Sequence, residues 1–398
     1  MKVLYAMAHS SDRLADERAG HVVRPRQLLA ALQELGHSTS VLEAAAGTGA
    51  QGAARSYWRV RDALPDGAAL VLRDTARVVQ NERFGRRLLR HVAADRPDVL
   101  LETQVAFSTA GAEVAAATGV PLLLDDVSPA SEDEGVYDVR LRRLARRRRV
   151  RALRVASLAV VTSERLREEL LAEGVPGAKV VVVPNAVPPA ALTPDPRAPE
   201  LRAELGFGPE AVVVAYVGSF QPFHRVALLV EALARPDVPA EVHALAVGDG
   251  DQRREVEDLA TSLGVRHRVR FTGRVPSDQV GTYLQVADVA VLPATAPYTN
   301  PMKLYDYLAS GRPVVAPDQR AVTDLLGDAP ASLFTPDSAA ALAASVTELA
   351  RDRERRQGMG AAALEAAHAH TWTHRAAQLV DLAAEHVPSR ARTGAAAR

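Results

Sequence analysis

The sequence contains no cysteine among its 398 residues, which excludes disulfide bonds, thiolate metal ligands and a cysteine nucleophile. It carries no net charge, because 48 lysines and arginines balance 48 aspartates and glutamates. A dedicated nucleic-acid-binding protein usually has a basic excess, so the balance argues against that class. No segment reaches the ~18 consecutive apolar residues of a membrane helix, and the apolar start at residues 1–8 is too short for a signal peptide. We therefore expect a cytoplasmic protein that does not bind nucleic acid.

Lysine is also scarce, since the chain has only Lys2, Lys179 and Lys303 and its other basic residues are arginines. An excess of arginine and alanine is typical of coding in a GC-rich genome, so a single arginine carries little information about function. A retained lysine carries more.

Short apolar runs alternate with helical patterns along the chain and fall into two groups. The first group comprises Val3–Met7, Val99–Leu101, Leu122–Leu124, Leu158–Val161 and Val180–Val183. The second comprises Val212–Val217, Val242–Val247, Val289–Leu292 and Val314–Ala316. Continuous apolar runs separated by helices indicate parallel sheets covered on both faces.

A proline-rich stretch from Pro184 to Pro199 separates the two groups and is the best candidate for a linker. The pattern predicts an α/β chain of two doubly wound, Rossmann-like domains that face each other across a cleft. We place the domains at residues 1–188 and 189–370, and expect a last helix at 371–388 to pack back on the first domain. Ligands of such sheets bind at the carboxyl ends of the strands.

The segment from Asn300 to Gly311 predicts a helix with both ends specified. Asn300 suits the N-cap, Pro301 the first helical position and Gly311 the position after the last turn. The 3/4 spacing predicts a buried face made by Met302, Tyr305, Leu308 and Ala309.

Lys303 and Asp306 share another face of this expected helix, three residues apart. A lysine in the first turn opposes the helix dipole, whereas a bound phosphate would compensate for it and use the free amides there. Asp306 would then accept hydrogen bonds from ribose hydroxyls. The alternative is an ordinary surface Lys–Asp pair.

Residues 301–316 resemble the nucleotide-sugar helix of retaining family 4 glycosyltransferases with the GT-B fold, in the branch that reads Pro-x-Lys-Leu-[Phe/Tyr]-[Glu/Asp]-Tyr. The family's commoner pattern has two glutamates eight apart, which fall here on Tyr298 and Asp306. The resemblance implies that Lys303 and the amides of residues 301–304 bind the diphosphate, and that Asp306 binds the ribose.

Further similarities follow in family order. Residues 216–224 resemble the glycine loop after the first strand of the donor domain, with Ser219 and His224-Arg225 where the family usually has Arg and Lys-Gly. Residues 271–276 resemble the loop that holds the base. Together these similarities imply a donor site, and a UDP-sugar is the first candidate for the donor. The residues that would line the site are Gly218, Ser219, His224, Arg225, Gly248, Arg274, Val275, Tyr298, Asn300, Pro301, Met302, Lys303, Leu304 and Asp306.

The resemblance assigns the acceptor to three loops of the first domain, at residues 9–26, 102–108 and 125–134. Many relatives have a catalytic histidine after the strand at 122–124, but this chain has Asp125-Asp126 there. The catalytic candidates are therefore Lys303, which would stabilise the leaving diphosphate, and the acid–base substitutes His9, Glu102, Asp125 and Asp126.

The charges of the acceptor loops support two kinds of acceptor. Carboxylates at 125–134 favour a cationic aminocyclitol or amino sugar, unless they are simply the solvated start of a helix. Arg24 and Arg26 favour a phosphorylated or carboxylated acceptor.

The mechanism that the resemblance implies is retaining transfer from a nucleoside diphosphate sugar without a metal or another cofactor. Asp249-Gly250-Asp251 lies in a loop where relatives do not chelate. We expect a glycosyltransferase of antibiotic or other specialised metabolism, of actinobacterial type. The alternatives are a transferase for a lipid-linked or phosphorylated acceptor, a sugar-nucleotide epimerase and an inactive nucleotide-sugar-binding subunit.

The arginine-rich run at residues 140–154 predicts a basic helix with a thin apolar stripe. It is interpreted first as a solvated outer face. The alternatives are peripheral contact with an anionic membrane surface and, less favoured, contact with nucleic acid.

Overall fold

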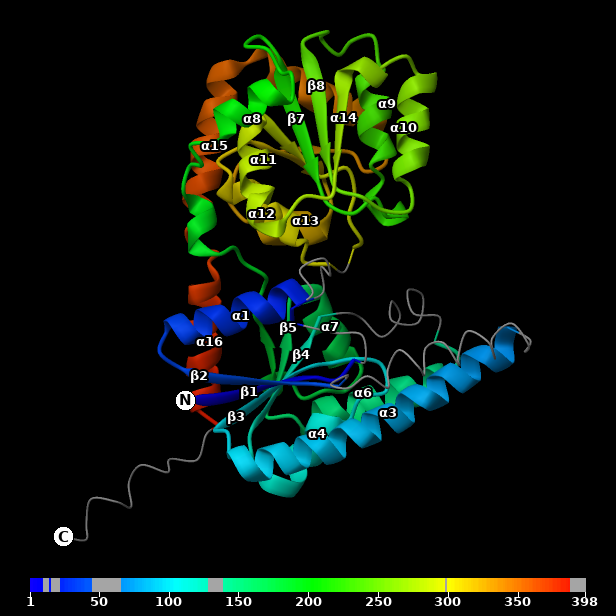
Figure 1. The fold of residues 1–398 in the computed structure, drawn as a ribbon, viewed down its shortest axis with the longest axis vertical. Coiled ribbons are helices and arrows are strands. Elements are labelled where there is room, and N and C mark those ends of the chain that lie inside the picture. Colours follow the sequence, from blue (N-terminus) through cyan, green and yellow to red (C-terminus); the bar gives the residue numbers. More distant parts are fainter. Residues whose placement is uncertain (10–13, 16–21, 45–65, 128–138, 298, 387–398) are drawn as a thin grey trace, which may run out of the picture. The chain divides into compact units, whose positions relative to one another are not determined.

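The computed structural model describes the chain except for residues 10–13, 16–21, 45–65, 128–138, 298 and 387–398. The chain divides into two units (Figure 1). Unit 1 comprises Met1–Pro184 with Ala376–Arg398, and unit 2 comprises Asn185–Arg375. The first boundary between the two units follows Pro184.

Unit 1 is built on a six-stranded sheet with the order β2-β1-β3-β4-β5-β6. The strands are β1 (Lys2–Met7), β2 (Ser38–Glu43), β3 (Val99–Thr103), β4 (Leu122–Asp126), β5 (Leu158–Val161) and β6 (Val180–Val182). The α-helices of this unit that precede residue 184 are α1 (Val23–Glu34), α3 (Asp66–Asp95), α4 (Ala110–Thr118), α6 (Arg142–Val155) and α7 (Glu164–Ala172).

Unit 2 is built on a second six-stranded sheet with the order β12-β11-β10-β7-β8-β9. The strands are β7 (Val212–Val217), β8 (Val242–Val247), β9 (Val269–Gly273), β10 (Val289–Val291), β11 (Val314–Pro317) and β12 (Ala331–Phe334). The helices are α8 (Ala198–Glu204), α9 (Ala227–Leu233), α10 (Arg253–Ser262), α11 (Val280–Val286), α12 (Met302–Ala309), α13 (Arg320–Leu326), α14 (Ala339–Arg351) and α15 (Arg353–Ala367).

All strand pairs between neighbours in the two sheets are parallel. The prediction of two doubly wound, Rossmann-like domains is therefore confirmed. Helix α16 (Trp372–Ala384) contains the second boundary between the units. Within unit 1, Gln378 of this helix donates to the carbonyl oxygen of Val182 at 3.4 Å.

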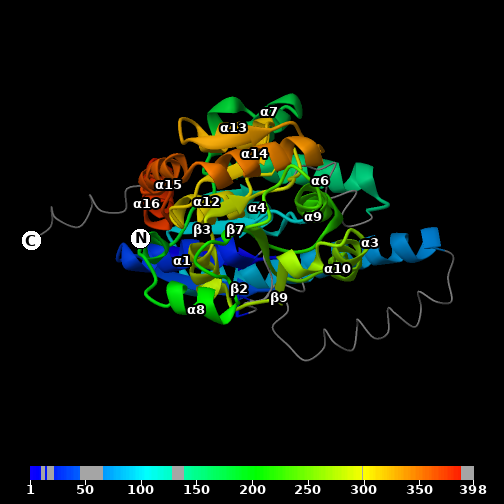
Figure 2. The same cartoon turned by 90° about the horizontal axis from the view of Figure 1, so that it is seen from above.

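Unit 2 has a hydrophobic core on each face of its sheet, because successive strand residues point to opposite sides. Val212, Val214 and Tyr216 pack with α9, α10 and α14 on one face. Val213 and Ala215 pack with α11, α12 and α13 on the other. Seen from above, α9 and α10 lie on one side of β7 and α12 on the other (Figure 2). Helix α12 is thereby held against the sheet, with its first turn near the carboxyl ends of the strands.

Candidate functional site

The strand order of unit 2 reverses at β7, which pairs with β8 on one side and with β10 on the other. The chain leaves these two neighbouring strands in opposite directions, so their carboxyl ends open a crevice. Gly218 directly follows β7, and the segment that leads to α12 follows β10. The topology therefore brings together two of the segments that sequence analysis assigned to a diphosphate.

The start of α12 differs in detail from the prediction. Pro301 occupies the N-cap position without a side-chain cap, and the helix begins at Met302. Asn300 is not the cap, because its amide oxygen accepts from the backbone N–H of Asn185 at 2.8 Å and from the Tyr305 hydroxyl at 3.0 Å. Asn300 thus ties the helix to the start of unit 2.

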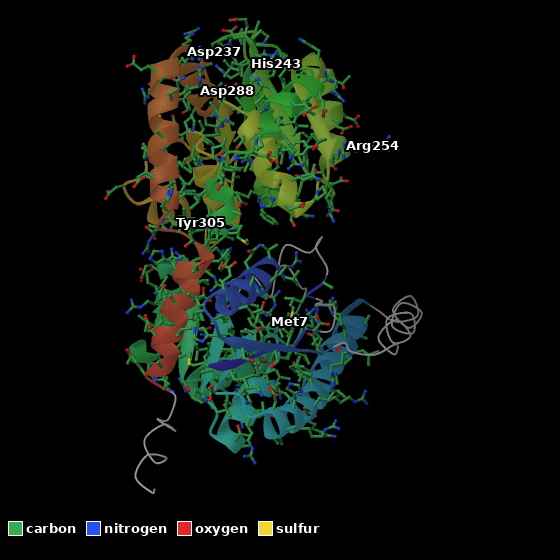
Figure 3. All side chains as sticks on the ribbon, turned by 60° about the vertical axis from the view of Figure 1, so that its left-hand side comes forward. Met7, Asp237, His243, Arg254, Asp288 and Tyr305 are labelled. Carbon is green, nitrogen blue, oxygen red and sulfur yellow. The ribbon has the colours of Figure 1, made fainter. Side chains whose placement is uncertain are left out.

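The predicted end and most of the predicted core face of α12 are confirmed. Gly311 has a φ of 67° after the last turn, and Tyr305, Leu308 and Ala309 are buried. The ring of Tyr305, labelled in Figure 3, meets His370 edge-on at 5.4 Å between centroids.

Met302 is only half-buried, which corrects the prediction, whereas Leu304 and Tyr307 are fully buried. The reason is that α12 packs against both the sheet and α15. The buried arc is therefore wider than the single stripe that was predicted.

The first turn of α12 has the free donors that an anion needs. The amide of Leu304 donates to Pro301 at 3.0 Å. Within the described part of the chain, the amides of Met302 and Lys303 have no acceptor. Unpaired amides at a helix start carry a partial positive charge.

Lys303 folds back over the glycine loop. Its Nζ lies 2.7 Å from Nε2 of His224 and 6.0 Å from the centre of the Tyr216 ring. Burial lowers the pKa of Lys303 to about 8, although Asp306 opposes this shift. Lys303 and Asp306 interact electrostatically, but both are partly buried, so they are not an ordinary surface pair.

Asp306 is held in a strongly desolvating environment. Burial raises the pKa of its carboxyl to about 7, and Lys303 works in the opposite direction. No hydrogen bond from a described residue reaches this carboxyl. It is therefore available to a ligand hydroxyl that would satisfy it.

His224 is buried and bonded through both ring nitrogens. Its Nδ1 lies 2.8 Å from the carbonyl oxygen of Ser219 and 3.2 Å from the hydroxyl of Ser219. Burial, and then the charge of Lys303, lower the pKa of His224 to about 4. The neutral imidazole thus joins the glycine loop to the lysine.

Glycine is required at two positions of this crevice. A Cβ on Gly218 would lie 2.0 Å from Cε of Lys303, and one on Gly248 would lie 1.9 Å from the carbonyl oxygen of Gly218. Both residues have positive φ, 151° and 133°. The loops after β7 and β8 therefore touch through their backbones, and Lys303 passes over the first of them.

The remaining donor-site candidates have different surroundings. Arg225 adopts a left-handed conformation with a φ of 45° and forms an ion pair with Asp337. Arg274 is exposed and has no hydrogen-bond partner among the described residues, and Val275 is half-buried. Tyr298 lies outside the described residues.

Two residues that support the loop were not singled out as site residues from sequence. The Tyr216 hydroxyl donates to the carbonyl oxygen of Ser219 at 2.6 Å, and the Tyr307 hydroxyl accepts from the amide of Val217 at 3.1 Å. Both tyrosines brace the turn from β7 into the glycine loop. The only signal in the sequence was that they lie within the two segments already assigned to the site.

The acid–base candidates of unit 1 already have partners. Asp125 accepts two hydrogen bonds of 2.9 Å from Arg24. Asp126 accepts one of 2.7 Å from Arg149, and burial raises the pKa of Asp126 to about 6. All four side chains are buried, which favours a structural role for both pairs.

Glu102 is also buried and satisfied. Its carboxyl oxygens accept from the Ser108 hydroxyl and from the amide of Gly111, each at 2.7 Å. Burial raises its pKa to about 7 despite these bonds. His9 is half-buried at the end of β1, and much of the loop that follows it lies outside the described residues.

The arginine-rich helix α6 has two kinds of arginine. Arg149 is buried between Asp126 and Glu173, and Arg148 donates to the carbonyl oxygen of Phe107 at 2.8 Å. The exposed arginines whose side chains have no partner among the described residues are Arg143, Arg147, Arg151 and Arg154. No helix in the described part of the chain is both long and apolar enough to cross a membrane.

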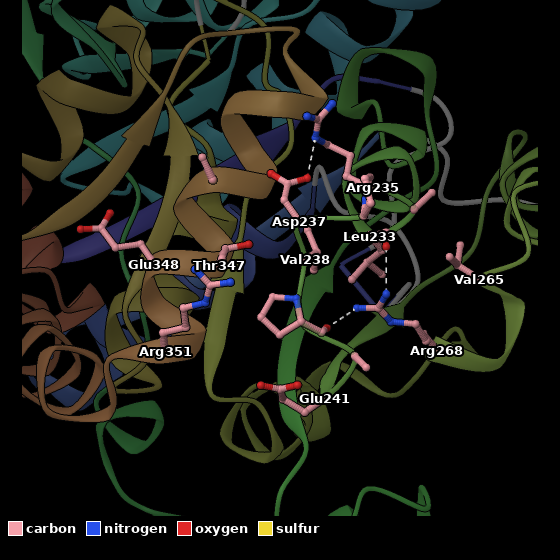
Figure 4. A pocket seen from close by; sticks show the side chains of 15 residues that line it. Leu233, Arg235, Asp237, Val238, Glu241, Val265, Arg268, Thr347, Glu348 and Arg351 are labelled. Atoms are coloured by element: carbon pink, nitrogen blue, oxygen red, sulfur yellow. Dashed lines mark hydrogen bonds and ion pairs between the residues drawn. The ribbon is translucent and has the colours of Figure 1, made fainter.

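A hollow of about 1060 Å³ lies at the other end of the unit 2 sheet (Figure 4). Its lining includes Pro239 and Glu241, which precede β8, and Arg268, which precedes β9. The guanidinium of Arg268 donates hydrogen bonds to the carbonyl oxygens of Leu233 and Pro239. The hollow is therefore separate from the crevice at the carboxyl ends of the strands. No group of three or more His, Asp or Glu side chains in the described residues is arranged to hold a metal.

The chain matches two models of protein families. Residues 211–352 match the model described as glycosyl transferases group 1, and residues 19–191 match the model described as Glycosyltransferase Family 4.

Similar curated proteins include the D-inositol 3-phosphate glycosyltransferase of Nocardia farcinica. It is 33% identical over 195 residues, which are 45% of this chain and 42% of that protein. The phosphatidyl-myo-inositol mannosyltransferase of Mycolicibacterium smegmatis is 31% identical over 183 residues, 44% of this chain and 45% of that protein. The chain thus spans less than half the length of the curated relatives it matches.

Solved structures are similar over nearly the whole chain. The Anabaena HepE protein in complex with UDP has a TM-score of 0.69 and 16% identity, covering 97% of this chain and 100% of that chain. Sucrose-phosphate synthase from Thermosynechococcus elongatus has a TM-score of 0.73 and 18% identity, covering 97% and 99%. At these identities the likeness shows the fold alone.

Proposed function

Because the chain belongs to the family 4 glycosyltransferases, we propose that it moves a sugar from a nucleoside diphosphate sugar to an acceptor hydroxyl with retention at the anomeric carbon. A UDP-sugar is the first candidate, since the similar Anabaena HepE structures hold UDP and UDP-glucose. The observation that carries the proposal is Lys303, held over Gly218 beside the free amides of the first turn of α12.

The chemistry of this site would stabilise the leaving group. As the sugar departs, negative charge grows on the diphosphate oxygens, and preorganised donors in a partly dry site lower the barrier. Lys303 supplies a full charge, and the amides of Met302 and Lys303 supply partial charges. The proposed reaction therefore uses no metal, and Asp306 accepts from the ribose.

Replacement of Lys303 by alanine tests the proposal. We expect Lys303→Ala to abolish turnover and to weaken nucleoside diphosphate binding, because the full charge that lies over the glycine loop is lost. Lys179→Ala is the matched control, since Nζ of Lys179 donates to carbonyl oxygens of Arg154 and Ala156 in unit 1. Unchanged diphosphate affinity of Lys303→Ala, measured by calorimetry, would refute the donor site.

For the acceptor we propose a phosphorylated polyol in preference to an aminocyclitol. The curated relatives include inositol 3-phosphate glycosyltransferases, and the carboxylates of Asp125 and Asp126 are neutralised by arginines. They are therefore poor ligands for a cationic acceptor, and Arg24 is equally occupied, so the preference rests on the relatives. Product formation from UDP-glucose with an inositol phosphate, and none with an aminocyclitol, is the expected result. The reverse preference would refute the assignment.

Slow hydrolysis of the donor without any acceptor separates a transferase from an inactive binding subunit. Epimerisation of the donor sugar, followed by nuclear magnetic resonance, would instead support the epimerase alternative.

A transferase at an anionic membrane surface is a second candidate, supported by α6. Its exposed arginines line a hollow of about 580 Å³ with Val150 and Val155. Such a helix binds anionic lipid through charge and apolar contact. Co-sedimentation with phosphatidylglycerol vesicles, lost in Arg143→Gln/Arg147→Gln/Arg151→Gln, would support it. Equal sedimentation with phosphatidylcholine vesicles would argue against it.

A further inference from the structure

His224 and Lys303 share a single hydrogen bond between two basic nitrogens. Nδ1 of His224 lies 2.8 Å from the Ser219 carbonyl oxygen, which only accepts, so Nδ1 carries a hydrogen and donates it. Nε2 then has no hydrogen and accepts one from the ammonium of Lys303, 2.7 Å away. The pair therefore holds one positive charge.

A second proton cannot join this pair while it remains closed. It would place two donors and two positive charges 2.7 Å apart in a buried site. The titratable and charged groups around the pair are Asp306 and Tyr307 of α12, Tyr216 of β7, and Arg225, which is paired with Asp337. Burial raises the pKa of both tyrosines, so they stay neutral.

We propose that a nucleoside diphosphate opens this pair and draws one proton from solvent onto Nε2 of His224. The inference rests on the proposed function of the site. The ammonium of Lys303 has three hydrogens, so the pair opens only when the phosphate draws the ammonium away from Nε2, which then loses the hydrogen bond that it received. The bare nitrogen then faces an anion, and protonation converts that repulsion into a charge-assisted hydrogen bond.

The result is a second cation that exists only in the complex. The usual lysine of the family falls on His224, so a fixed charge is replaced by one that the ligand induces. In the empty site burial holds the pKa of His224 at about 4, and a bound anion raises it. Between the two pKa values, affinity rises as the pH falls, by at most about tenfold per pH unit.

Calorimetry with UDP-glucose at about pH 6 tests the inference. UDP-glucose is a diphosphate diester without the terminal phosphate that itself titrates near pH 6 in UDP. Titrations in two buffers with different enthalpies of ionisation give the number of protons taken up. At this pH Lys303, with a pKa of about 8, is already charged and adds little.

Three variants identify the group that takes the proton. We expect uptake approaching one proton in the wild type, none in His224→Gln, and continued uptake in Asp306→Asn, which removes the other group that titrates nearby. His243→Gln is the matched control, because His243 lies at the opposite end of β8 from Gly248 (Figure 3) and should not affect proton uptake.

Binding without proton uptake in the wild type would overturn the inference and leave the proposed function intact. Uptake that persists in His224→Gln and disappears in Asp306→Asn would do the same. If His224→Gln does not bind UDP-glucose, the pKa of His224 is measured in the wild type from its imidazole resonances by nuclear magnetic resonance. A pKa that UDP-glucose leaves unchanged would overturn the inference. If UDP-, GDP- and dTDP-glucose all fail to bind the wild type, the proposed function falls as well.

Discussion

Gly218→Ala should damage the donor site by displacing Lys303. The new methyl group would lie 2.0 Å from Cε of Lys303 and 2.9 Å from the Tyr216 hydroxyl. The φ of 151° at this position is also one that side chains rarely adopt. Because the lysine end is flexible, we expect the side chain to move away and the fold to persist.

The structure allows the two losses to be estimated separately. Backbone strain of this kind costs about 1–3 kcal/mol of stability. A displaced Lys303 forfeits a hydrogen bond to a charged phosphate, worth about 1.5–3 kcal/mol. That second loss corresponds to a Kd for UDP that is about 10- to 100-fold weaker.

Calorimetric titration with UDP, together with the melting temperature, measures both effects. Gly281→Ala is the matched control, because Gly281 lies in α11 with nothing within 4 Å of the added methyl group. It should stabilise the helix by up to about 1 kcal/mol and leave affinity unchanged. A Gly218→Ala protein that melts earlier but binds UDP within about twofold of the wild type would refute the role of Lys303.

Three further predictions concern Asp306, Arg149 and Glu102. Asp306→Ala should weaken the binding of UDP more than the binding of pyrophosphate, as measured by calorimetry. Equal losses of affinity for the two ligands would reject a ribose contact. Arg149→Met should cost about 3–5 kcal/mol in urea denaturation, because it leaves buried carboxylates unpaired, whereas exposed Arg147→Ala should stay within about 0.5 kcal/mol. The pKa of Glu102 is about 7 in the folded chain against an ordinary 4.5, so the free energy of unfolding should fall as pH rises through that window. Glu102→Gln should remove up to about 3 kcal/mol of this pH dependence. Its amide oxygen can still accept from the amide of Gly111, while its amide nitrogen would donate to the Ser108 hydroxyl in the reverse direction. A loss of turnover in Glu102→Gln without any change in the pH dependence of stability would instead support a catalytic role.

Most of the strands that could be predicted are buried on both faces, and the edge strand β6 was predicted because it is a run of valines. Strands β5 and β7 are continuous apolar segments, and β8 is interrupted only by His243. Their bounds match the predicted ones, because a central parallel strand is apolar on both sides. The strands β2, β9 and β12 were not predicted. They lie at the edges of the sheets, where one side of the backbone is unpaired and sequences such as Ser38–Glu43 include polar residues.

The candidate donor site could be proposed from sequence because its chemistry lies in short contiguous segments. A lysine in a first helical turn and a glycine after a strand are local features with local physical reasons. The partners of charged side chains could not be predicted in this way. Arg24 and Asp125, or Arg149 and Asp126, are far apart in the chain and meet only because parallel strands and helices bring them together.

By itself, then, the sequence determined the fold class and the place of the candidate donor site, because hydrophobic periodicity and helix-end chemistry depend on neighbouring residues. Only the tertiary structure decided which charges are available. It buried Asp125 and Asp126 in ion pairs, paired Arg225 with Asp337, and set Lys303 against His224. Ion pairs and pKa values depend on distances and burial across the fold, which no local pattern contains.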